Sequence, residues 1–231
     1  MIDNMNPLNV GDCIKATFVT ELPVRFRCII SIAGEEKECY VPSSCKLEPL
    51  IKLKNKEVLV RKQDSGKTSL YSLVAVKHKS NYVLLNSSYA NQLFMESVAR
   101  RLFGFLGKRK KVISEYTLSD YRCDFYIEDT NTIIEVKSII SDKDKVFFPA
   151  MESKRFLHQL STIKANMIAG KKSNLIVIVM NPYLKEIDLN KCLQCYELIK
   201  ECMELGMTVR AFKCRLSEGK FEIVSSVKIR N

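Results

Sequence analysis

The chain has 231 residues, of which 46% are hydrophobic, and its 37 Lys and Arg residues outnumber its 26 Asp and Glu residues, which gives a net charge of +11. This composition excludes a wholly disordered chain, and the length allows one large domain or two small ones that each bury a core. The positive charge favours a polyanionic partner, because Lys and Arg that neutralise phosphates release condensed counterions.

Short strands separated by turn residues are predicted for residues 1–85. These segments alternate apolar and polar side chains or are briefly apolar, and they lie at 13–19, 24–33, 37–42, 57–63, 68–77 and 82–86. Such a series predicts a small barrel such as an OB-fold, with a sandwich as the alternative. Five aromatic residues in the strands either pack in the barrel or stack on nucleobases: Phe18, Phe26, Tyr40, Tyr71 and Tyr82.

The spacing of apolar residues becomes helical after Ser87, which predicts a helix that ends near Gly107. Strands are then expected at 111–118, 122–128 and 132–140, a helix at 151–169, a strand at 174–180, a helix at 188–205, and strands at 207–215 and 220–228. This order predicts an α/β (α+β) protein of two domains, in which residues 86–231 form a mixed sheet with flanking helices.

No segment predicts export or insertion in a membrane. The longest apolar run, Leu175 to Met180, is too short to span a bilayer, and the first residues lack a basic segment followed by an apolar one. We therefore expect a cytoplasmic protein with no membrane partner, whose nine scattered cysteines are reduced thiols.

Two neighbouring strands carry acidic residues among apolar ones, Asp124 in RCDFYIE and Glu135 in TIIEVKSII. Residues two apart on a strand share a face, so Glu135 and Lys137 point the same way. If the strands form a hairpin through residues 128–131, Asp124 lies opposite Glu135. Two close carboxylates can hold a divalent cation, and a lysine beside them can orient water and stabilise a phosphorane-like transition state. The alternative is a surface ion pair, because Glu-x-Lys also occurs three more times in this chain.

This pattern resembles the Asp…Glu-x-Lys core of PD-(D/E)XK nucleases, and more narrowly the sugar fermentation stimulation protein A (SfsA) family. Five segments carry the resemblance: RFRCII (25–30), CYVPSS (39–44), LNSSYANQLFMESV (85–98), SEYTLSDYRCDF (114–125) and FFPAMESKRFLHQL (147–160). The chain departs from the family pattern at Ser43-Ser44-Cys45, at Ser119-Asp120-Tyr121 and at Phe148-Pro149-Ala150.

The resemblance implies an N-terminal OB-fold, a restriction-endonuclease-like second domain, and nucleic acid as substrate or ligand. It implies that Asp124 and Glu135 bind Mg²⁺ or Mn²⁺ and that Lys137 is the catalytic lysine. The backbone carbonyl of Val136 and the carboxylate of Glu96 are further candidate metal ligands. Glu115 and Arg122 are expected to flank the site. His158, on the helix after the active-site strands, is a candidate to reach a phosphate or a leaving group, with a solvated or core-edge histidine as the alternative.

Basic residues are candidate phosphate contacts. The densest cluster lies between residues 100 and 111, which contain no acid, and the alternative for it is a solvated helix end whose cations complement the helix dipole. The candidates are Arg25, Arg27, Arg100, Arg101, Lys108, Arg109, Lys110, Lys111, Arg122, Lys154 and Arg155.

Two further motifs are interpreted as structural. The stretch 64–68 resembles a P-loop, but Arg61 stands where the first glycine is required, so a hairpin turn is expected. Cys192, Cys195 and Cys202 lack the second pair of a structural zinc site and are expected to be apolar core residues.

The leading hypothesis is a metal-dependent nuclease that hydrolyses DNA and/or RNA. The first alternative is a DNA-binding regulatory protein of the sugar fermentation stimulation type that keeps the nuclease fold with little or no turnover. The second is a structural or protein-interaction module whose acids form an ion-pair network. The sequence leaves open whether DNA or RNA is preferred and whether the protein is a homodimer.

Overall fold

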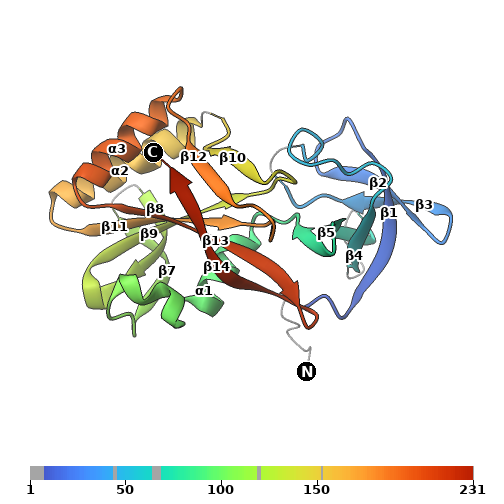
Figure 1. The fold of residues 1–231 in the computed structure, drawn as a ribbon, viewed down its shortest axis with the longest axis horizontal. Coiled ribbons are helices and arrows are strands. Elements are labelled where there is room, and N and C mark those ends of the chain that lie inside the picture. The colour runs from blue at the N-terminus through green and yellow to red at the C-terminus, as the bar shows by residue number, and fades with distance from the viewer. Residues whose placement is uncertain (1–7, 44–45, 64–68, 119–120, 152, 231) are drawn as a thin grey trace.

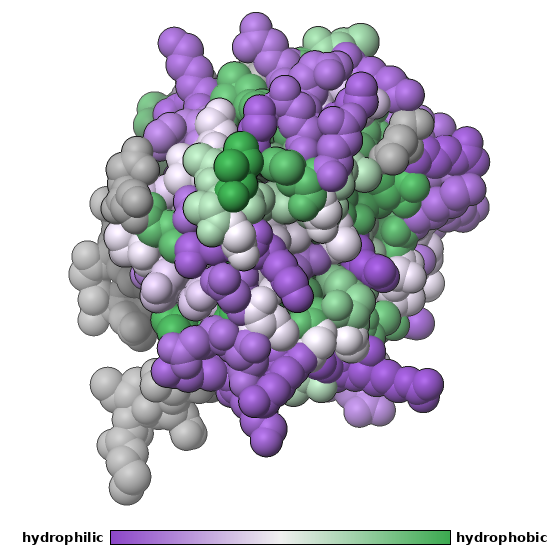
Figure 2. All heavy atoms as spheres, turned by 90° about the vertical axis from the view of Figure 1, so that its left-hand side faces the viewer, coloured by the Kyte–Doolittle hydropathy of each residue, from purple (hydrophilic) through white to green (hydrophobic). Residues whose placement is uncertain are grey.

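The computed structural model describes residues 8–43, 46–63, 69–118, 121–151 and 153–230. A six-stranded sheet from the N-terminal part stands beside an eight-stranded sheet that carries the α-helices (Figure 1). Among the described residues, no helix has the length and apolar character needed to cross a membrane. Seen from one side, hydrophilic residues are spread over the surface, and smaller groups of hydrophobic residues are exposed among them (Figure 2).

The N-terminal strands form a closed barrel. Their order is β3-β2-β1-β4-β5-β6, and a parallel pairing of β3 with β5 closes the first five strands on themselves. This circuit is that of an OB-like barrel, so the barrel prediction is confirmed and the sandwich is not. The strands are β1 (Cys13–Glu21), β2 (Arg27–Ile32), β3 (Glu35–Tyr40), β4 (Glu57–Lys62), β5 (Tyr71–His78) and β6 (Asn81–Leu84).

The second sheet is mixed, in the order β10-β12-β14-β13-β11-β9-β8-β7. Its centre is parallel, because β9, β11 and β13 run together, while β7, β8 and β9 form an antiparallel meander. The strands are β7 (Val112–Leu118), β8 (Tyr121–Ile127), β9 (Thr132–Ile139), β10 (Lys145–Phe148), β11 (Lys172–Val179), β12 (Glu186–Leu189), β13 (Thr208–Ser217) and β14 (Lys220–Arg230).

Helices cover both faces of this sheet, α2 and α3 on one and α1 on the other (Figure 1). Ser153 caps α2 by accepting a hydrogen bond from the amide of Phe156 at 3.3 Å. Both α2 and α3 are followed by a glycine with positive φ, Gly170 and Gly206, as expected at a helix C-terminus. The helical segments are α1 (Tyr89–Ser97), α2 (Lys154–Ile168), α3 (Gln194–Glu204) and two 3₁₀ turns, η1 (Arg101–Leu106) and η2 (Glu128–Thr130).

Two hydrophobic cores hold the molecule together. One lies under α2 and α3, and the other runs without a break from the barrel to the α1 face of the second sheet. The start of the described chain also joins the far end of the sequence, since the amide of Val10 donates to the carbonyl of Gly219 at 2.8 Å. The division into domains of 1–85 and 86–231 therefore stays a prediction.

Three element predictions were wrong. The range of the expected helix at 188–205 begins within the strand β12 and, after a turn, holds the shorter helix α3. The strand β10 was not expected at all. The helix expected to reach Gly107 ends at Ser97, and the extended backbone of Arg100 (ψ 154°) separates it from η1. Tertiary contacts override helix propensity at this break, because the guanidinium of Arg100 donates to the carbonyl of Ile223 at 2.7 Å.

Candidate active site

Asp124 lies in β8 at the point where its pairing with β9 ends. The last paired residues are Phe125 and Ile134, so the register would place Asp124 opposite Glu135, as the hairpin argument predicts. The Asp124 carboxylate accepts two hydrogen bonds, from the amide of Val136 at 2.7 Å and from the side-chain amide of Asn91 in α1 at 2.9 Å. The Asp124 side chain therefore connects β8 to β9 where their backbone pairing ends, and Asn91 of α1 fixes its position.

A local inversion of the strand pair orients Asp124. Glu115, which faces it in β7, has a φ of 52°, an uncommon value for a residue other than glycine. In β8, Cys123 and Tyr126 both pack in the core under α2 and α3. Residues three apart on a regular strand would point to opposite faces, and Phe125 packs in the other core. The regular alternation of side chains is thus broken at Asp124, and a sequence pattern of period two cannot predict this.

Glu135 is a buried carboxylate, with 1% of the residue exposed. It accepts hydrogen bonds from the hydroxyl of Tyr121 and from the ammonium of Lys137. Burial raises the pKa of Glu135, and the negative charge of Asp124 raises it further, whereas the charge of Lys137 opposes the rise. The same burial raises the pKa of Tyr121, so that its hydroxyl remains a donor to the carboxylate.

Lys137 joins the acid pair to α2. Its ammonium contacts Glu135, donates to the side-chain carbonyl of Gln159 at 3.0 Å, and lies 5.1 Å from the centre of the Phe156 ring. Glu135 and Lys137 therefore share a face of β9, as predicted. Gln159 was missed, although a polar residue on the buried face of an amphipathic helix is a signal that the sequence does contain.

Four other residues expected around the acids pair with other side chains or lie at the surface. Glu96 pairs with Lys220 at 2.7 Å, and the described residues contain no group of three His, Cys, Asp or Glu side chains that could hold a metal ion. The role of Glu96 as a metal ligand therefore stays a prediction, and Asn91 is a residue of α1 whose side chain donates to Asp124. Arg122 forms an exposed pair with Glu115 at 3.4 Å, and His158 is exposed on α2, one residue before Gln159.

The basic cluster at 100–111 is largely engaged by the protein itself. The guanidinium of Arg109 donates to the backbone carbonyls of residues 98, 99, 100 and 107, so these donors have a structural role. Lys108 and Lys111 pair with Asp129 and Glu128 of η2, at 3.2 and 2.6 Å. The sequence count missed these acids because the fold brings them in from another segment.

The remaining basic candidates are at the surface. Arg27 pairs with Glu38 at 2.7 Å on the barrel. Arg25, Arg101, Lys110, Lys154 and Arg155 are exposed. These exposed residues keep the charge available to a phosphate backbone, so their proposed contact with nucleic acid stays a prediction.

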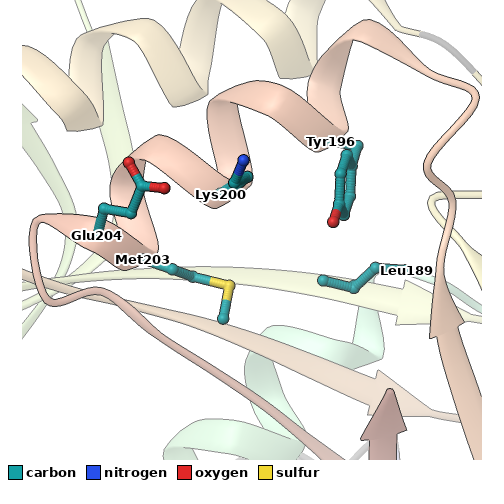
Figure 3. Close-up of a pocket in the computed structure, with 5 residues that line it drawn as sticks. All are labelled: Leu189, Tyr196, Lys200, Met203 and Glu204. Carbon is teal, nitrogen blue, oxygen red and sulfur yellow. The ribbon is translucent and has the colours of Figure 1, made fainter. Parts of the chain in front are cut away.

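The competing motifs carry no further site in the described residues. Cys195 and Cys202 are buried free thiols, as expected, while Cys192 precedes α3 and is exposed. The P-loop-like stretch 64–68 lies outside the described residues, as do Ser44, Cys45, Ser119 and Asp120. A separate slot of about 260 Å³ lies between α3 and the end of β12, where Tyr196, Met203 and Leu189 form an apolar wall (Figure 3). None of the acid-pair residues lines it.

Comparisons with known proteins agree with this architecture. Residues 88–220 match the description "Sugar fermentation stimulation protein RE domain". Sugar fermentation stimulation protein homologs from Aquifex aeolicus and Clostridium botulinum are 28% and 23% identical to the chain, covering 91% and 94% of it and 95% and 98% of their own lengths. The solved structure of Pyrococcus furiosus SfsA in complex with Ca²⁺ has a TM-score of 0.82 at 16% identity, and the match covers 98% of this chain and 100% of that one. At this identity the likeness shows the fold.

Proposed function

The chain belongs to the sugar fermentation stimulation protein (SfsA) family, and from this premise we propose that it hydrolyses phosphodiester bonds of DNA or RNA with the help of a divalent metal ion. One observation carries the proposal. The carboxylates of Asp124 and Glu135 and the ammonium of Lys137 converge where two apolar strands separate, and Glu135 is almost fully buried. Two acids in such surroundings repel each other unless a cation is present, which is the arrangement that a metal-dependent hydrolase needs.

The donor set fits a hard divalent cation. The two carboxylates offer only oxygen atoms, which Mg²⁺, Mn²⁺ and Ca²⁺ prefer, and a cation would relieve the rise in the pKa of Glu135 caused by burial and by Asp124. When bound, such an ion supplies a charge that polarises the phosphate and an attacking water. The family member from Pyrococcus furiosus was solved in complex with Ca²⁺, which supports a divalent cation here. The backbone carbonyl of Val136 stays a candidate ligand.

The protein side chains contribute position and charge. Asn91 and the amide of Val136 fix the orientation of Asp124, and Tyr121 fixes that of Glu135. Lys137 provides an ammonium between Glu135 and Gln159, which can orient a water molecule and stabilise negative charge on a phosphate oxygen.

The barrel offers a surface for the nucleic-acid chain. Phe26 and Tyr40 are 6.2 Å apart between ring centres, and the exposed Arg25 lies next to Phe26 in the turn between β1 and β2. This turn and the β2–β3 face are where OB-folds bind oligonucleotides. Phe26 also has a φ of 67°, a strained conformation for a bulky residue, and such strain gathers at functional sites.

The test is cleavage of labelled single- and double-stranded DNA and RNA in Mg²⁺, Mn²⁺ or EDTA. We expect metal-dependent cutting that is lost in Asp124→Ala and in Lys137→Ala. Lys164→Ala is the matched control, because Lys164 forms an ion pair with Glu201 of α3 at 3.1 Å and belongs neither to the acid pair nor to the β2–β3 face. Cutting that survives both site variants would contradict the proposal.

A second candidate is a DNA-binding regulatory protein with little or no turnover. It is favoured by the absence of a third acidic, His or Cys ligand around the pair within the described part of the chain. This candidate predicts salt-sensitive binding of DNA without cleavage on any substrate or metal. The same assay therefore separates the two, because binding with no cutting by the wild type would favour the regulator.

A further inference from the structure

A cleft of about 550 Å³ opens beside Lys137 and is lined by residues from both parts of the chain. Pro49 and Leu50 belong to the segment between β3 and β4, whereas Phe147 and Met151 come from β10 and the segment after it. This volume lies within the usual range of small-ligand sites. Lys137 is part of the lining, so the cleft reaches the lysine whose ammonium contacts Glu135 of the acid pair.

The apolar lining is unusually exposed. Phe147 is 60% exposed and Met151 is 63% exposed, whereas Phe148, the next residue in β10, is buried in the core. A strand sends alternate side chains to opposite sides, so the register that buries Phe148 leaves the side chain of Phe147 exposed, and both residues line the cleft. The ring of Phe147 thus adds nothing to the core and is available to a ligand.

The charged side chains of the cleft are all basic. Its lining among the described residues contains Lys137, Lys143 and Lys145 and no acid. Lys145 is paired with Glu186 and Asp188 at 2.9 and 2.7 Å, and Lys143 is exposed. An exposed aromatic ring flanked by lysines is the combination with which proteins bind single-stranded nucleic acid, through base stacking and phosphate attraction.

We propose that this cleft holds one unpaired nucleobase, stacked on Phe147, next to the phosphate at the acid pair. The inference rests on the proposed nuclease function and names its substrate class, which is single-stranded nucleic acid or a strand with an unpaired nucleotide at the site. Bases inside a duplex already stack on their neighbours and cannot present a face to Phe147. The cleft therefore discriminates against continuous duplex at the reacting position.

The test measures the binding of labelled single strands and of the matched duplexes in EDTA, where no metal-dependent cleavage occurs. Removing one stacking contact should weaken single-strand binding by roughly 5- to 150-fold in Phe147→Ala. Phe147→Tyr keeps an aromatic ring and should retain the affinity. Ile168→Ala is the control, because Ile168 is 68% exposed at the end of α2 and does not line the cleft.

A strand with one abasic position identifies the stacked base. The abasic site should weaken binding to the wild type and have no further effect on Phe147→Ala, because base and ring act as a pair. If Phe147→Ala binds single strands as tightly as the wild type does, the stacking inference is overturned and the nuclease proposal stands. Failure of the wild type to bind or cut any nucleic acid would overturn both.

Discussion

Replacing Asn91 by alanine tests whether the acid pair is held as the structure indicates. Asn91 donates to Asp124 at 2.9 Å from α1, and the amide of Val136 donates to the same carboxylate at 2.7 Å. Asn91→Ala removes one of these two hydrogen bonds and leaves the carboxylate half-buried. We expect lower stability and a less well oriented Asp124, and therefore lower metal-dependent activity.

The expected magnitude follows from two opposing effects. A hydrogen bond to a charged group contributes roughly 1.5–3 kcal/mol to the free energy of unfolding. Alanine has a higher helix propensity than asparagine, which raises the free energy of unfolding by up to about 0.7 kcal/mol within α1. The net loss should be about 1–2 kcal/mol. Gln92→Ala is the matched control, because Gln92 is the next residue of α1 and donates to Glu96 at 2.9 Å at the surface. Its loss should be within about 0.5 kcal/mol.

The assay is urea unfolding followed by far-ultraviolet circular dichroism, since the chain contains no tryptophan. A double-mutant cycle of Asn91→Ala with Asp124→Ala cancels the helix-propensity gain and isolates the interaction between the two side chains. We expect a coupling of about 1 kcal/mol or more. A coupling near zero, or equal losses for Asn91→Ala and Gln92→Ala, would refute the assignment of Asn91 as the positioning residue of Asp124.

Three further predictions concern stability and binding. Arg109→Ala should lower the free energy of unfolding by about 2 kcal/mol, because the guanidinium of Arg109 donates to backbone carbonyls. It should leave nucleic-acid affinity unchanged in a filter-binding assay. Lys110→Ala removes an exposed charge and should lower that affinity while leaving the free energy of unfolding unchanged. Tyr121→Phe removes a donor from the buried carboxylate of Glu135 and should cost about 1.5–3 kcal/mol in urea unfolding measured in EDTA; an unchanged midpoint would contradict this. Burial and the nearby lysine charges lower the pKa of His78 in the folded protein below its ordinary value of about 6.5. As the pH is lowered through that ordinary value, the imidazole takes up a proton in the unfolded chain before it does so in the folded protein. The free energy of unfolding therefore decreases as the pH decreases. Wild type should lose more stability than His78→Gln between about pH 7.5 and about pH 5.5, and equal losses would exclude this cause.

The sequence predicted the acid pair because its geometry depends on local rules. A hairpin centred on residues 128–131 fixes which residues face each other, and the two-residue period of a strand fixes that Glu135 and Lys137 share a face. Neither rule needs the rest of the fold. The barrel was predicted for a similar reason, since its strands alternate strongly and are separated by clear turn residues.

What the sequence did not predict depends on contacts between distant segments. Glu115 has a positive φ, and because the residue is not a glycine, the sequence does not indicate this conformation. Only the folded chain brings η2 to the basic cluster and Asn91 to Asp124. The strands β10 and β12 have four residues each, β10 pairs with β12, and β12 pairs with β14. Their stability therefore comes from pairing at the sheet edge rather than from their own sequence pattern. The cleft beside Lys137 has walls from residues 49–50 and 137–151, which no local pattern joins.

The energetic cost of the Glu135 site is itself an argument for function. A carboxylate that is 1% exposed loses most of its hydration, and an ion pair with one lysine seldom repays that loss better than apolar residues of the same volume would. Glu135 lies on a strand whose neighbours Ile133, Ile134 and Val136 are all buried, so an apolar residue would suit the position. The fold instead supplies Tyr121, Lys137 and, through Lys137, Gln159 to keep this carboxylate in place. It places them beside a basic cleft with an exposed aromatic ring, and together these features favour a site for an anionic substrate over a structural ion pair.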